Sequence, residues 1–320
     1  MVSVVLVTYN RANRLRESIQ DILDQTFTDF ELLICDDKSN DNTETISRQF
    51  CLIDERIKYF RHDVNKGMPG NLNFGIENAT SNYIAILHDG DRFKPTLLQN
   101  WFNAINTNES VGFVFNSIGV TDENESIVTN FKEFSTGILA KKYLLQDVFF
   151  RRWLFDSPVY GEVMIKKALV VELGYFKLKY GFYADVDMWM SMLHKYDAYY
   201  YEETLITGPL KTIQPRLFDD KILKTFFYMF EMHLDHRKIE FRNSRNLYRE
   251  LIRFYYYSFK GLTFNLILLA KNYNLKTYLA SFKLIFSKSP FFFIPWLFVF
   301  LLRPIISIIF MTKRVQNKFL

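Results

Sequence analysis

Apolar runs alternate with amphipathic segments along the first two hundred residues. Most runs are rich in Val, Ile and Leu and lack alternating polar positions, which is typical of strands buried on both faces of a sheet. These predicted strands lie at residues 2–8, 30–37, 56–62, 83–87 and 111–118. Apolar positions at helical spacing predict helices at about residues 15–25, 69–80, 166–173 and 185–194, and one that begins after Asp41 or Asn42. This alternation predicts an α/β fold with a mostly parallel sheet flanked by helices.

The last third of the chain has a different pattern, and we place a domain boundary near residue 215. Residues 216–320 are predicted to be helical, and four arginines at helical spacing predict a basic stripe: Arg242, Arg245, Arg249 and Arg253. Residues 291–311 form an apolar stretch long enough to span a bilayer. Arg303 lies just past its middle, where an arginine costs roughly 2.5–3.5 kcal/mol on insertion scales. We therefore expect an interfacial or re-entrant segment here.

The net charge of +5 is unevenly divided between the two regions. Residues 1–215 hold 22 Lys+Arg against 29 Asp+Glu, whereas residues 216–320 hold 18 against 6. An acidic region can supply metal ligands, and a basic, aromatic region suits an anionic membrane surface. Helices that pack on the core or on another subunit are the alternative for residues 216–320. A nucleic-acid partner is not expected, because the basic residues accompany Phe-rich stretches and no binding module is evident.

Two features bear on the compartment. Cys35 and Cys51 are too few for a disulfide framework, which indicates a reducing compartment. The first apolar run lacks a basic leader and a cleavage site, so we expect a strand and not a signal peptide. We therefore expect a cytoplasmic protein, peripheral to or anchored in the inner face of the cell membrane.

Polar residues directly follow the first two predicted strands. Thr8, Tyr9 and Asn10 come after the first strand, and Asp36 and Asp37 end the second. If the strands are neighbours, these groups face one crevice, where a ring can stack on a base and a carboxylate can accept a base N–H. The alternative is that the first group forms a turn and that the acids cap the next helix.

Two further motifs surround the strand at residues 83–87. His88-Asp89-Gly90-Asp91 follows it directly, and two carboxylates around one glycine can bind Mg²⁺ or Mn²⁺ on a diphosphate. An ordinary DGD turn is the alternative. Upstream, a turn leads into a helix whose N-terminus can face a phosphate. The residues of that motif are Asn65, Lys66, Gly67 and Asn73.

Asp185 and Asp187 open the predicted helix at residues 185–194. One of them is a natural helix N-cap, and the competing interpretation is a general base that takes a proton from an acceptor hydroxyl. The five histidines show no zinc spacing, and the sequence contains neither a P-loop nor a GxGxxG fingerprint.

Three segments, taken together, resemble one family. Residues 2–43, which contain VSVVLVTYN and FELLICDD, resemble the opening of the inverting family 2 glycosyltransferases, which have a GT-A fold. Residues 65–95 (NKGMPGNLNFGIENATSNYIAILHDGDRFKP) are similar to the segment that runs into the family's DXD motif. Residues 174–206 (GYFKLKYGFYADVDMWMSMLHKYDAYYYEETLI) are similar to its acceptor-side segment. The resemblance covers about residues 2–207 and implies a GT-A (Rossmann-like) sheet.

The resemblance also implies roles on the donor side. Tyr9 would lie against the nucleotide base with Thr8 beside it, and Asp37 would bind the base edge with Asp36 adjacent. The fit of Tyr9 and Asp37 to a pyrimidine favours a UDP-sugar donor. The acceptor would be a glycan or a polyprenyl-linked molecule, in a setting such as bacterial surface-polysaccharide synthesis.

For the metal and the chemistry, the resemblance assigns three acids. Asp89 and Asp91 would serve the ribose, the metal (Mn²⁺ or Mg²⁺) and the diphosphate. Asp185 matches the aspartate of the family's Glu-Asp pair, so it would be the catalytic base of a single displacement with inversion. The sequence departs from the family at Gly90, where an acid is common, and at Ala184, where the glutamate precedes the base.

Two other functions stay open: the departures at Gly90 and Ala184 allow the first, and the α/β nucleotide-binding type of sheet allows the second. One is a non-catalytic module that binds sugar nucleotides at a membrane. The other is a sugar nucleotidyltransferase, although TYNRANR lacks the glycines that such an enzyme needs after its first strand.

Overall fold

The structure is a computed structural model that describes residues 1–122, 126–151, 157–209, 220–258 and 297. Its chain divides into two compact units. The first consists of Met1–Arg151 and Ser157–Lys211, and the second of Arg152–Asp156 and Thr212–Leu320. The expected boundary near residue 215 lies outside the described residues, as does the apolar stretch at residues 291–311 apart from Leu297.

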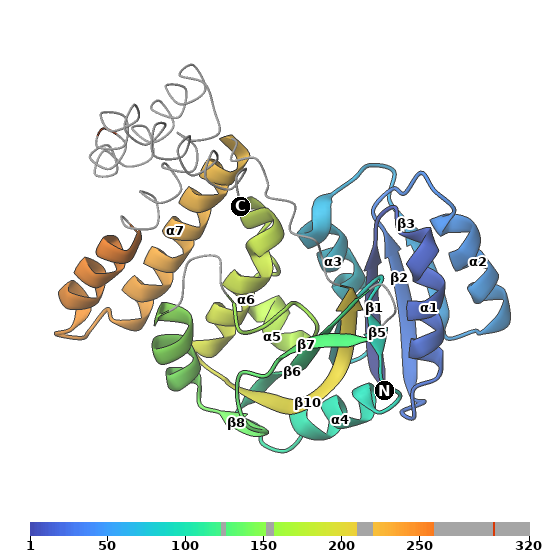
Figure 1. Cartoon of the computed structure of the whole chain (residues 1–320), viewed down its shortest axis with the longest axis horizontal. Coiled ribbons are helices and arrows are strands. Elements are labelled where there is room, and N and C mark those ends of the chain that lie inside the picture. The colour runs from blue at the N-terminus through green and yellow to red at the C-terminus, as the bar shows by residue number, and fades with distance from the viewer. Residues whose placement is uncertain (123–125, 152–156, 210–219, 259–296, 298–320) are drawn as a thin grey trace, which may run out of the picture. The chain divides into compact units, whose positions relative to one another are not determined.

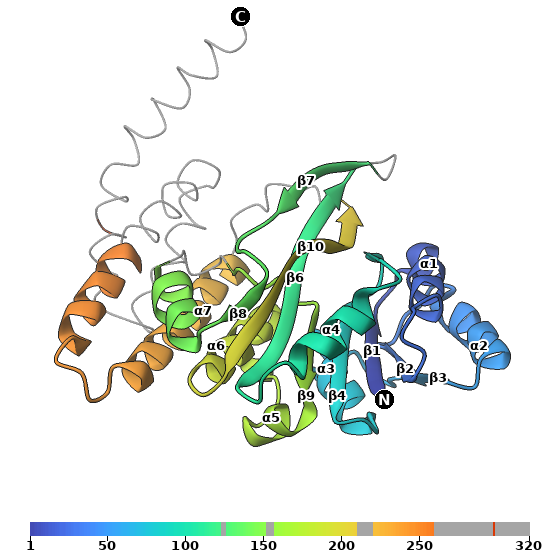
Figure 2. The same cartoon turned by 90° about the horizontal axis from the view of Figure 1, so that it is seen from below.

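A ten-stranded sheet forms the centre of the first unit (Figures 1 and 2). Eight strands follow the order β3-β2-β1-β4-β9-β6-β10-β5, while β7 pairs with β6 and β8 with β10. The strands are β1 (Val2–Thr8), β2 (Phe30–Asp36), β3 (Ile57–Arg61), β4 (Tyr83–His88), β5 (Arg92–Phe93), β6 (Val111–Thr121), β7 (Ile127–Phe131), β8 (Gly137–Leu139), β9 (Val163–Lys166) and β10 (Asp197–Pro209).

The α/β class and the GT-A type of sheet are confirmed, but the expectation of a mostly parallel sheet needs correction. Strands β3, β2, β1 and β4 are parallel, as is the pair of β6 and β10. Strand β9 runs antiparallel to both β4 and β6, and β5, β7 and β8 add further antiparallel pairs. The sheet is therefore mixed. Four of the five predicted strands carry long apolar runs, whereas β5 and β8 are too short to produce a sequence pattern.

Helices cover both faces of this sheet. They are α1 (Ala12–Leu23), α2 (Thr43–Ile53), α3 (Gly67–Asn78), α4 (Leu97–Ile105), α5 (Lys167–Glu172) and α6 (Ala184–Leu193), with short helical turns at Tyr143–Val148, Phe149–Arg151 and Leu178–Tyr183. One face packs α1, α2 and α4 in a core that contains Leu15, Phe50 and Trp101. On the other face, Phe113 of β6 stacks on Trp189 of α6, with ring centroids 5.5 Å apart.

In the second unit, α7 (Asp220–Glu240) packs against a helical segment at residues 247–258. Phe230 stacks on Phe254 at 5.0 Å, and the guanidinium of Arg237 lies 4.2 Å from the centre of the same ring. The predicted arginine stripe is only partly correct. Arg249 and Arg253 lie on the helix, but Arg242 and Arg245 lie in the turn before it. Among the described residues, no helix is long and apolar enough to span a membrane.

Candidate active site

The first strands end together at one edge of the sheet. Thr8 pairs with Asp36 across β1 and β2, and Val7 pairs with His88 across β1 and β4. The Thr8 hydroxyl donates to Asp89 Oδ2 at 2.7 Å, and the Asp37 N–H donates to the Thr8 carbonyl at 3.0 Å. The structure therefore brings together the polar residues at the end of β1 and the acids at the ends of β2 and β4. The carboxyl ends of parallel strands are where ligands bind in open α/β sheets.

Asp36 and Asp37 have different surroundings. The Asp36 carboxylate is fully buried and accepts hydrogen bonds from the Tyr59 hydroxyl at 2.6 Å and the Ser39 N–H at 2.8 Å. Asp37 Oδ1 accepts the N–H of Lys66 at 2.6 Å, and the Asn65 amide donates to the Asp37 carbonyl at 3.1 Å. Asp36 thus connects the end of β2 to β3 and to the loop that follows β2. Asp37 holds the loop that leads into α3.

Tyr9 projects from this edge with 48% of its surface exposed. The residue after it, Asn10, has a left-handed backbone (φ 53°) that asparagine tolerates better than most residues. Asn10 Oδ1 accepts the Asn40 N–H at 2.8 Å, and the Asn10 N–H donates to Ser39 Oγ at 2.8 Å. These bonds tie the two loops together and leave the Tyr9 ring presented at the surface.

The loop before α3 supports the expectation of a turn. Asn65 Oδ1 accepts the N–H of Gly67, which has a φ of 73° and begins α3. Asn73 lies further along this helix and exchanges hydrogen bonds, each 2.9 Å long, with the backbone N–H and C=O of Phe176. Asn73 therefore joins α3 to the segment before α6, whereas residues 65–67 lie next to Asp37.

The Asp89-Gly90-Asp91 turn is anchored by α1. Ser18 Oγ accepts the Gly90 N–H at 3.0 Å and donates to the Asp91 carbonyl at 2.9 Å, and Gly90 has a φ of 88°. Burial raises the pKa of Asp89, and the hydrogen bond from Thr8 and the charge of Arg11 partly offset this effect. Arg11 Nη1 lies 3.8 Å from Asp89 Oδ1. Asp89 is therefore held against the end of β1.

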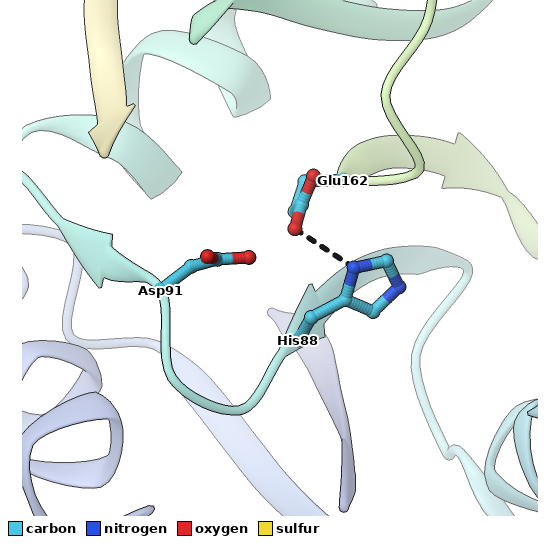
Figure 3. Close-up of side chains that lie close together, drawn as sticks. All are labelled: His88, Asp91 and Glu162. Carbon is cyan, nitrogen blue, oxygen red and sulfur yellow. Dashed lines mark ion pairs between the residues drawn. The ribbon is translucent and has the colours of Figure 1, made fainter. Parts of the chain in front are cut away.

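Asp91 lies in a different cluster, with His88 and Glu162 (Figure 3). One potential ligand atom from each side chain lies within 4.8 Å of the other two. His88 Nδ1 is 2.8 Å from Glu162 Oε1, and Glu162 is 5% exposed. One imidazole and two carboxylates form a set that can hold a divalent cation. The two acids that the sequence predicts as metal ligands therefore have different partners. Asp89 accepts a hydrogen bond from Thr8, whereas Asp91 belongs to this cluster.

Asp185 lies at the start of α6, where it is partly buried. Burial raises the pKa of its carboxyl to about 6, and the Val186 N–H, 2.8 Å from Oδ1, opposes that rise. The charges of His88 and Glu162 also act on this carboxyl, so Asp185 lies near the cluster. The structure does not confirm an N-cap role for either Asp185 or Asp187. Tyr183 occupies the N-cap position of α6, and its side chain makes no capping hydrogen bond. Asp187 instead pairs with Lys177 at 2.9 Å.

A cavity of about 390 Å³ opens beside the Asp89-Gly90-Asp91 turn. Polar side chains of α1, including Arg14 and Glu17, line one part, and Thr207 and Gly208 of β10 line another. Sequence reasoning missed both β10 and Glu162 as parts of this region. Glu162 follows Gly161 in a segment without periodicity, so only the pairing of β9 with β4 brings it next to His88.

Comparisons with known proteins show the family to which this chain belongs. The glycosyl transferase family 2 model matches residues 3–164, just over half of the chain. One curated relative is the GalNAc(5)-diNAcBac-PP-undecaprenol beta-1,3-glucosyltransferase of Campylobacter jejuni, which is 28% identical over 62% of this chain and 61% of its own length. The chain spans about half to two thirds of the length of the first curated relatives.

Solved structures show the same fold. S. aureus TarS 1-349, in complex with UDP-GlcNAc, matches with a TM-score of 0.60 and 15% identity over 84% of this chain and 78% of its own. The mannosyltransferase PcManGT from Pyrobaculum calidifontis, in complex with GDP-Man and Mn²⁺, matches with a TM-score of 0.53 and 15% identity over 93% and 86%. The chain therefore belongs to glycosyl transferase family 2, as the family model, the relatives and the GT-A fold agree.

Proposed function

We propose that this glycosyltransferase moves a sugar from a UDP-sugar donor to an acceptor hydroxyl with inversion, in the synthesis of a polysaccharide or a lipid-linked glycan. One observation carries the proposal. Asp185, a partly buried carboxyl whose pKa is raised to about 6, lies near the edge where the end of β1 meets the acids after β2 and β4. A carboxyl with this pKa is largely ionised at neutral pH and can still accept a proton.

On the donor side, we assign the nucleotide to the edge formed by β1 and β2. The exposed Tyr9 ring can stack on the base, and Asp37, 4% exposed and hydrogen-bonded to the loop before α3, lies at the base edge. Asp89, bonded to Thr8, serves the ribose and diphosphate. Asn65, Lys66 and Gly67 form the loop beside Asp37 that borders this donor site. The UDP-GlcNAc complex of the TarS fold relative supports a uridine donor.

In the proposed reaction, the acceptor hydroxyl oxygen forms a bond to the anomeric carbon of the sugar. Its proton moves to the Asp185 carboxylate, and the bond between the anomeric carbon and the diphosphate oxygen breaks on the opposite face. The nucleoside diphosphate leaves with that electron pair. A single displacement of this kind inverts the configuration at the anomeric carbon.

We also propose that the reaction depends on Mn²⁺ or Mg²⁺. A bound cation would neutralise charge on the leaving diphosphate. Asp91 and its neighbours offer ligands for it, and the PcManGT complex with Mn²⁺ supports this requirement for a protein of the same fold.

A thermal-shift screen tests the donor assignment. The purified chain is heated with UDP, GDP, dTDP or CMP, each with Mn²⁺ and with EDTA, because a ligand that binds the native state raises its apparent stability. We expect a shift with UDP that requires the metal and is lost in Asp91→Asn. The exposed Glu55→Gln is the matched control and should respond like the natural chain.

Three outcomes would change the proposal. No shift with any nucleotide, in a chain shown to be folded, would contradict the donor site. Nucleotide binding without transfer or hydrolysis of any UDP-sugar would instead favour a non-catalytic binding module. Formation of UDP-sugar from a sugar phosphate would favour a nucleotidyltransferase.

For residues 216–320, we propose a domain that holds the enzyme on the anionic inner face of the cell membrane, near a glycan or polyprenyl-linked acceptor. The helical segment at 247–258 supports this location. Tyr248, Ile252 and Tyr256 are 79%, 71% and 64% exposed, and Arg249 and Arg253 are exposed next to them. Exposed tyrosines and arginines on one helix are typical of the membrane interface.

Vesicle co-sedimentation tests this location. We expect binding to vesicles with anionic lipid, weaker binding at high salt, and loss of binding in Arg249→Glu with Arg253→Glu. The control carries the same charge change at exposed positions of the first unit, Arg16→Glu with Arg48→Glu. Equal binding of both double variants to the vesicles would contradict the membrane role of this helix.

A further inference from the structure

We infer that Phe131 and Tyr160 form a platform for the acceptor, on which one neutral sugar ring stacks with a hydroxyl directed towards Asp185. The identity of the stacked sugar as the acceptor rests on the proposed function, but its binding to the two rings is measured without a donor. Neither ring belongs to a sequence motif, and neither is among the proposed donor or metal residues.

The two rings come from segments far apart in the chain. Phe131 ends β7, and Tyr160 lies in the loop before β9. Their ring centroids lie 5.3 Å apart, with an angle of 37° between the ring planes. Phe131 is 41% exposed and Tyr160 is 38% exposed. The pair therefore presents an aromatic surface that a ligand can reach.

The position of β7 explains why Phe131 points outward. Among the described strands, β7 pairs only with β6, and all five of its residues are exposed. Asn130 Oδ1 accepts the hydroxyl of Thr204 on β10 at 3.1 Å, so the Asn130 side chain lies over the face of the sheet that carries Thr204. Successive side chains of a strand point to opposite faces. Phe131 therefore projects from the other face, where it meets Tyr160.

The loop before β9 is fixed on both sides of Tyr160. On one side, Val159 is buried, and Ser157 Oγ accepts the Val159 N–H at 3.1 Å and donates to the Val159 carbonyl at 2.8 Å. On the other side, the next residue is Gly161, where a Cβ would lie only 2.7 Å from His88 Cε1. The buried valine and the close approach at the glycine thus hold Tyr160 between them.

This loop also places Tyr160 beside the acids of the site. Glu162, two residues after Tyr160, lies 2.8 Å from His88. The charges of His88 and Glu162 act on the carboxyl of Asp185. The platform is therefore next to the proposed general base, and its occupant is the molecule whose hydroxyl that base deprotonates.

The combination of rings and carboxylates selects a neutral sugar. The face of a pyranose ring that carries axial hydrogens is apolar and packs on an aromatic ring, while the hydroxyls at its rim donate to carboxylates. Glu162 and Asp185 repel an acceptor group that carries negative charge. A polyprenyl chain also packs on aromatic rings, but it has no hydroxyl for the carboxylates. A sugar ring satisfies both parts of the site.

Saturation-transfer difference NMR of the full chain with neutral disaccharides tests the platform. The probes are cellobiose, N,N′-diacetylchitobiose, lactose and maltose, each added without a donor. We expect at least one of them to bind, with the strongest transfer to the axial hydrogens on one face of one ring. Phe131→Leu and Tyr160→Leu should each weaken this binding by about five- to tenfold, the size of a lost aromatic contact.

Two further variants serve as controls. Tyr160→Phe keeps the ring and should bind the disaccharide as the natural chain does. Tyr228 has almost the same exposed fraction, 37%, but lies on α7 in the second unit, so Tyr228→Leu should leave sugar binding unchanged. Near-UV circular dichroism checks that each variant folds. If Tyr160→Leu fails to fold, Phe131→Leu on the exposed strand carries the test.

Three results would overturn the platform. The first is that the natural chain binds none of the disaccharides or that both leucine variants bind them equally well. The second is a loss of binding confined to Phe182→Leu, since Phe182 is a 73% exposed ring three residues before Asp185. The third is that Phe131→Leu weakens sedimentation with anionic vesicles and leaves sugar binding unchanged, which would show that the rings face lipid.

The UDP-dependent thermal shift separates this inference from the proposed function. Sugar binding that depends on both rings, in a chain that shows no shift with any nucleotide, would refute the proposed function alone. A normal shift with UDP in a chain that binds no disaccharide would refute the platform alone.

Discussion

Asp185 is a carboxyl whose ionisation the folded structure makes more costly. Its carboxyl sits at the start of α6 with one backbone hydrogen bond, and burial raises its pKa to about 6. Asp187, two residues further along, is instead paired with Lys177. The proposed role as general base explains why a carboxyl that is costly to ionise occupies this position.

We expect Asp185→Asn to reduce sugar transfer by about 10²–10⁴-fold, since it removes the proton acceptor. Donor binding should persist, because Tyr9 and Asp37 are unchanged. In the natural enzyme the carboxylate is the active form, so kcat/KM should rise with pH and level off above the pKa of about 6. A radiolabelled-sugar transfer assay between pH 5 and 9 measures both effects. Full activity in Asp185→Asn, or an activity that rises towards pH 5, would contradict this role.

At the scale of elements, α3 lies unusually close to the strands that carry the donor residues. A Cβ at Gly75 would stand 2.4 Å from Val5 Cγ1 and 3.0 Å from Cys35 Sγ. The absence of a side chain at Gly75 therefore sets the distance between α3 and the pair β1 and β2. The loop of Asn65 and Gly67, at the start of α3, takes its position relative to Asp37 from this packing.

Gly75→Ala should therefore destabilise the protein, by about 1–3 kcal/mol, because an added methyl overpacks a filled core. The gain in helix propensity, about 1 kcal/mol, does not offset a contact of 2.4 Å. Urea unfolding followed by circular dichroism measures the difference. Glu77→Ala, an exposed change two residues further along α3, is the control and should stay within about 0.5 kcal/mol. A more stable Gly75→Ala would contradict the packing argument.

Glu31 joins the other ends of the same strands. It accepts hydrogen bonds from Ser3 on β1 and from both the N–H and the hydroxyl of Thr80, and it pairs with Lys58 on β3. Burial alone would raise its pKa, but these bonds together lower the pKa to about 2. The Glu31 side chain thus connects β1, β2 and β3 at the end of the sheet opposite the proposed donor site.

Because the folded-state pKa of Glu31 lies below its ordinary value of 4.5, its stabilisation is complete above pH 4.5 and disappears as the pH falls towards 2. We expect Glu31→Gln to cost about 2 kcal/mol at pH 7, allowing for screening of the half-exposed Lys58, and little at pH 2. Urea unfolding at a series of pH values provides the test. A stability difference that does not shrink at low pH would show that the charge is not responsible.

At the scale of the molecule, the proposed donor and metal residues all belong to the first unit. The basic, aromatic segment at 247–258 belongs to the second. This division matches the charge asymmetry of the sequence and suggests that catalysis and membrane binding can be separated.

A chain that ends at Lys211 should therefore unfold cooperatively and still show the UDP-dependent thermal shift. It should no longer sediment with anionic vesicles, because it lacks Arg249 and Arg253. Calorimetry and vesicle co-sedimentation make these measurements, with the full chain as reference. Loss of nucleotide binding in a folded truncated chain would show that the second unit contributes to the donor site.

The sequence alone determined the strands β1, β2, β4 and β6, the polar residues that follow β1 and the acids at the ends of β2 and β4. Long apolar runs can only be buried on both faces, and parallel strands place their carboxyl ends at one edge. The catalytic role of Asp185 stays a prediction that came from resemblance, since its helix start was equally compatible with an N-cap.

Only the tertiary structure decided which acids lie close to one another. The antiparallel insertion of β9 between β4 and β6 brings Glu162 to His88, and the return of β10 places Gly208 against Asp91. These partners lie 74 and 117 positions apart in the chain, and no local pattern encodes such a pairing. The division of Asp89 from Asp91 has the same cause: the two carboxylates flank one glycine but face different neighbours, Thr8 of β1 and Glu162 before β9.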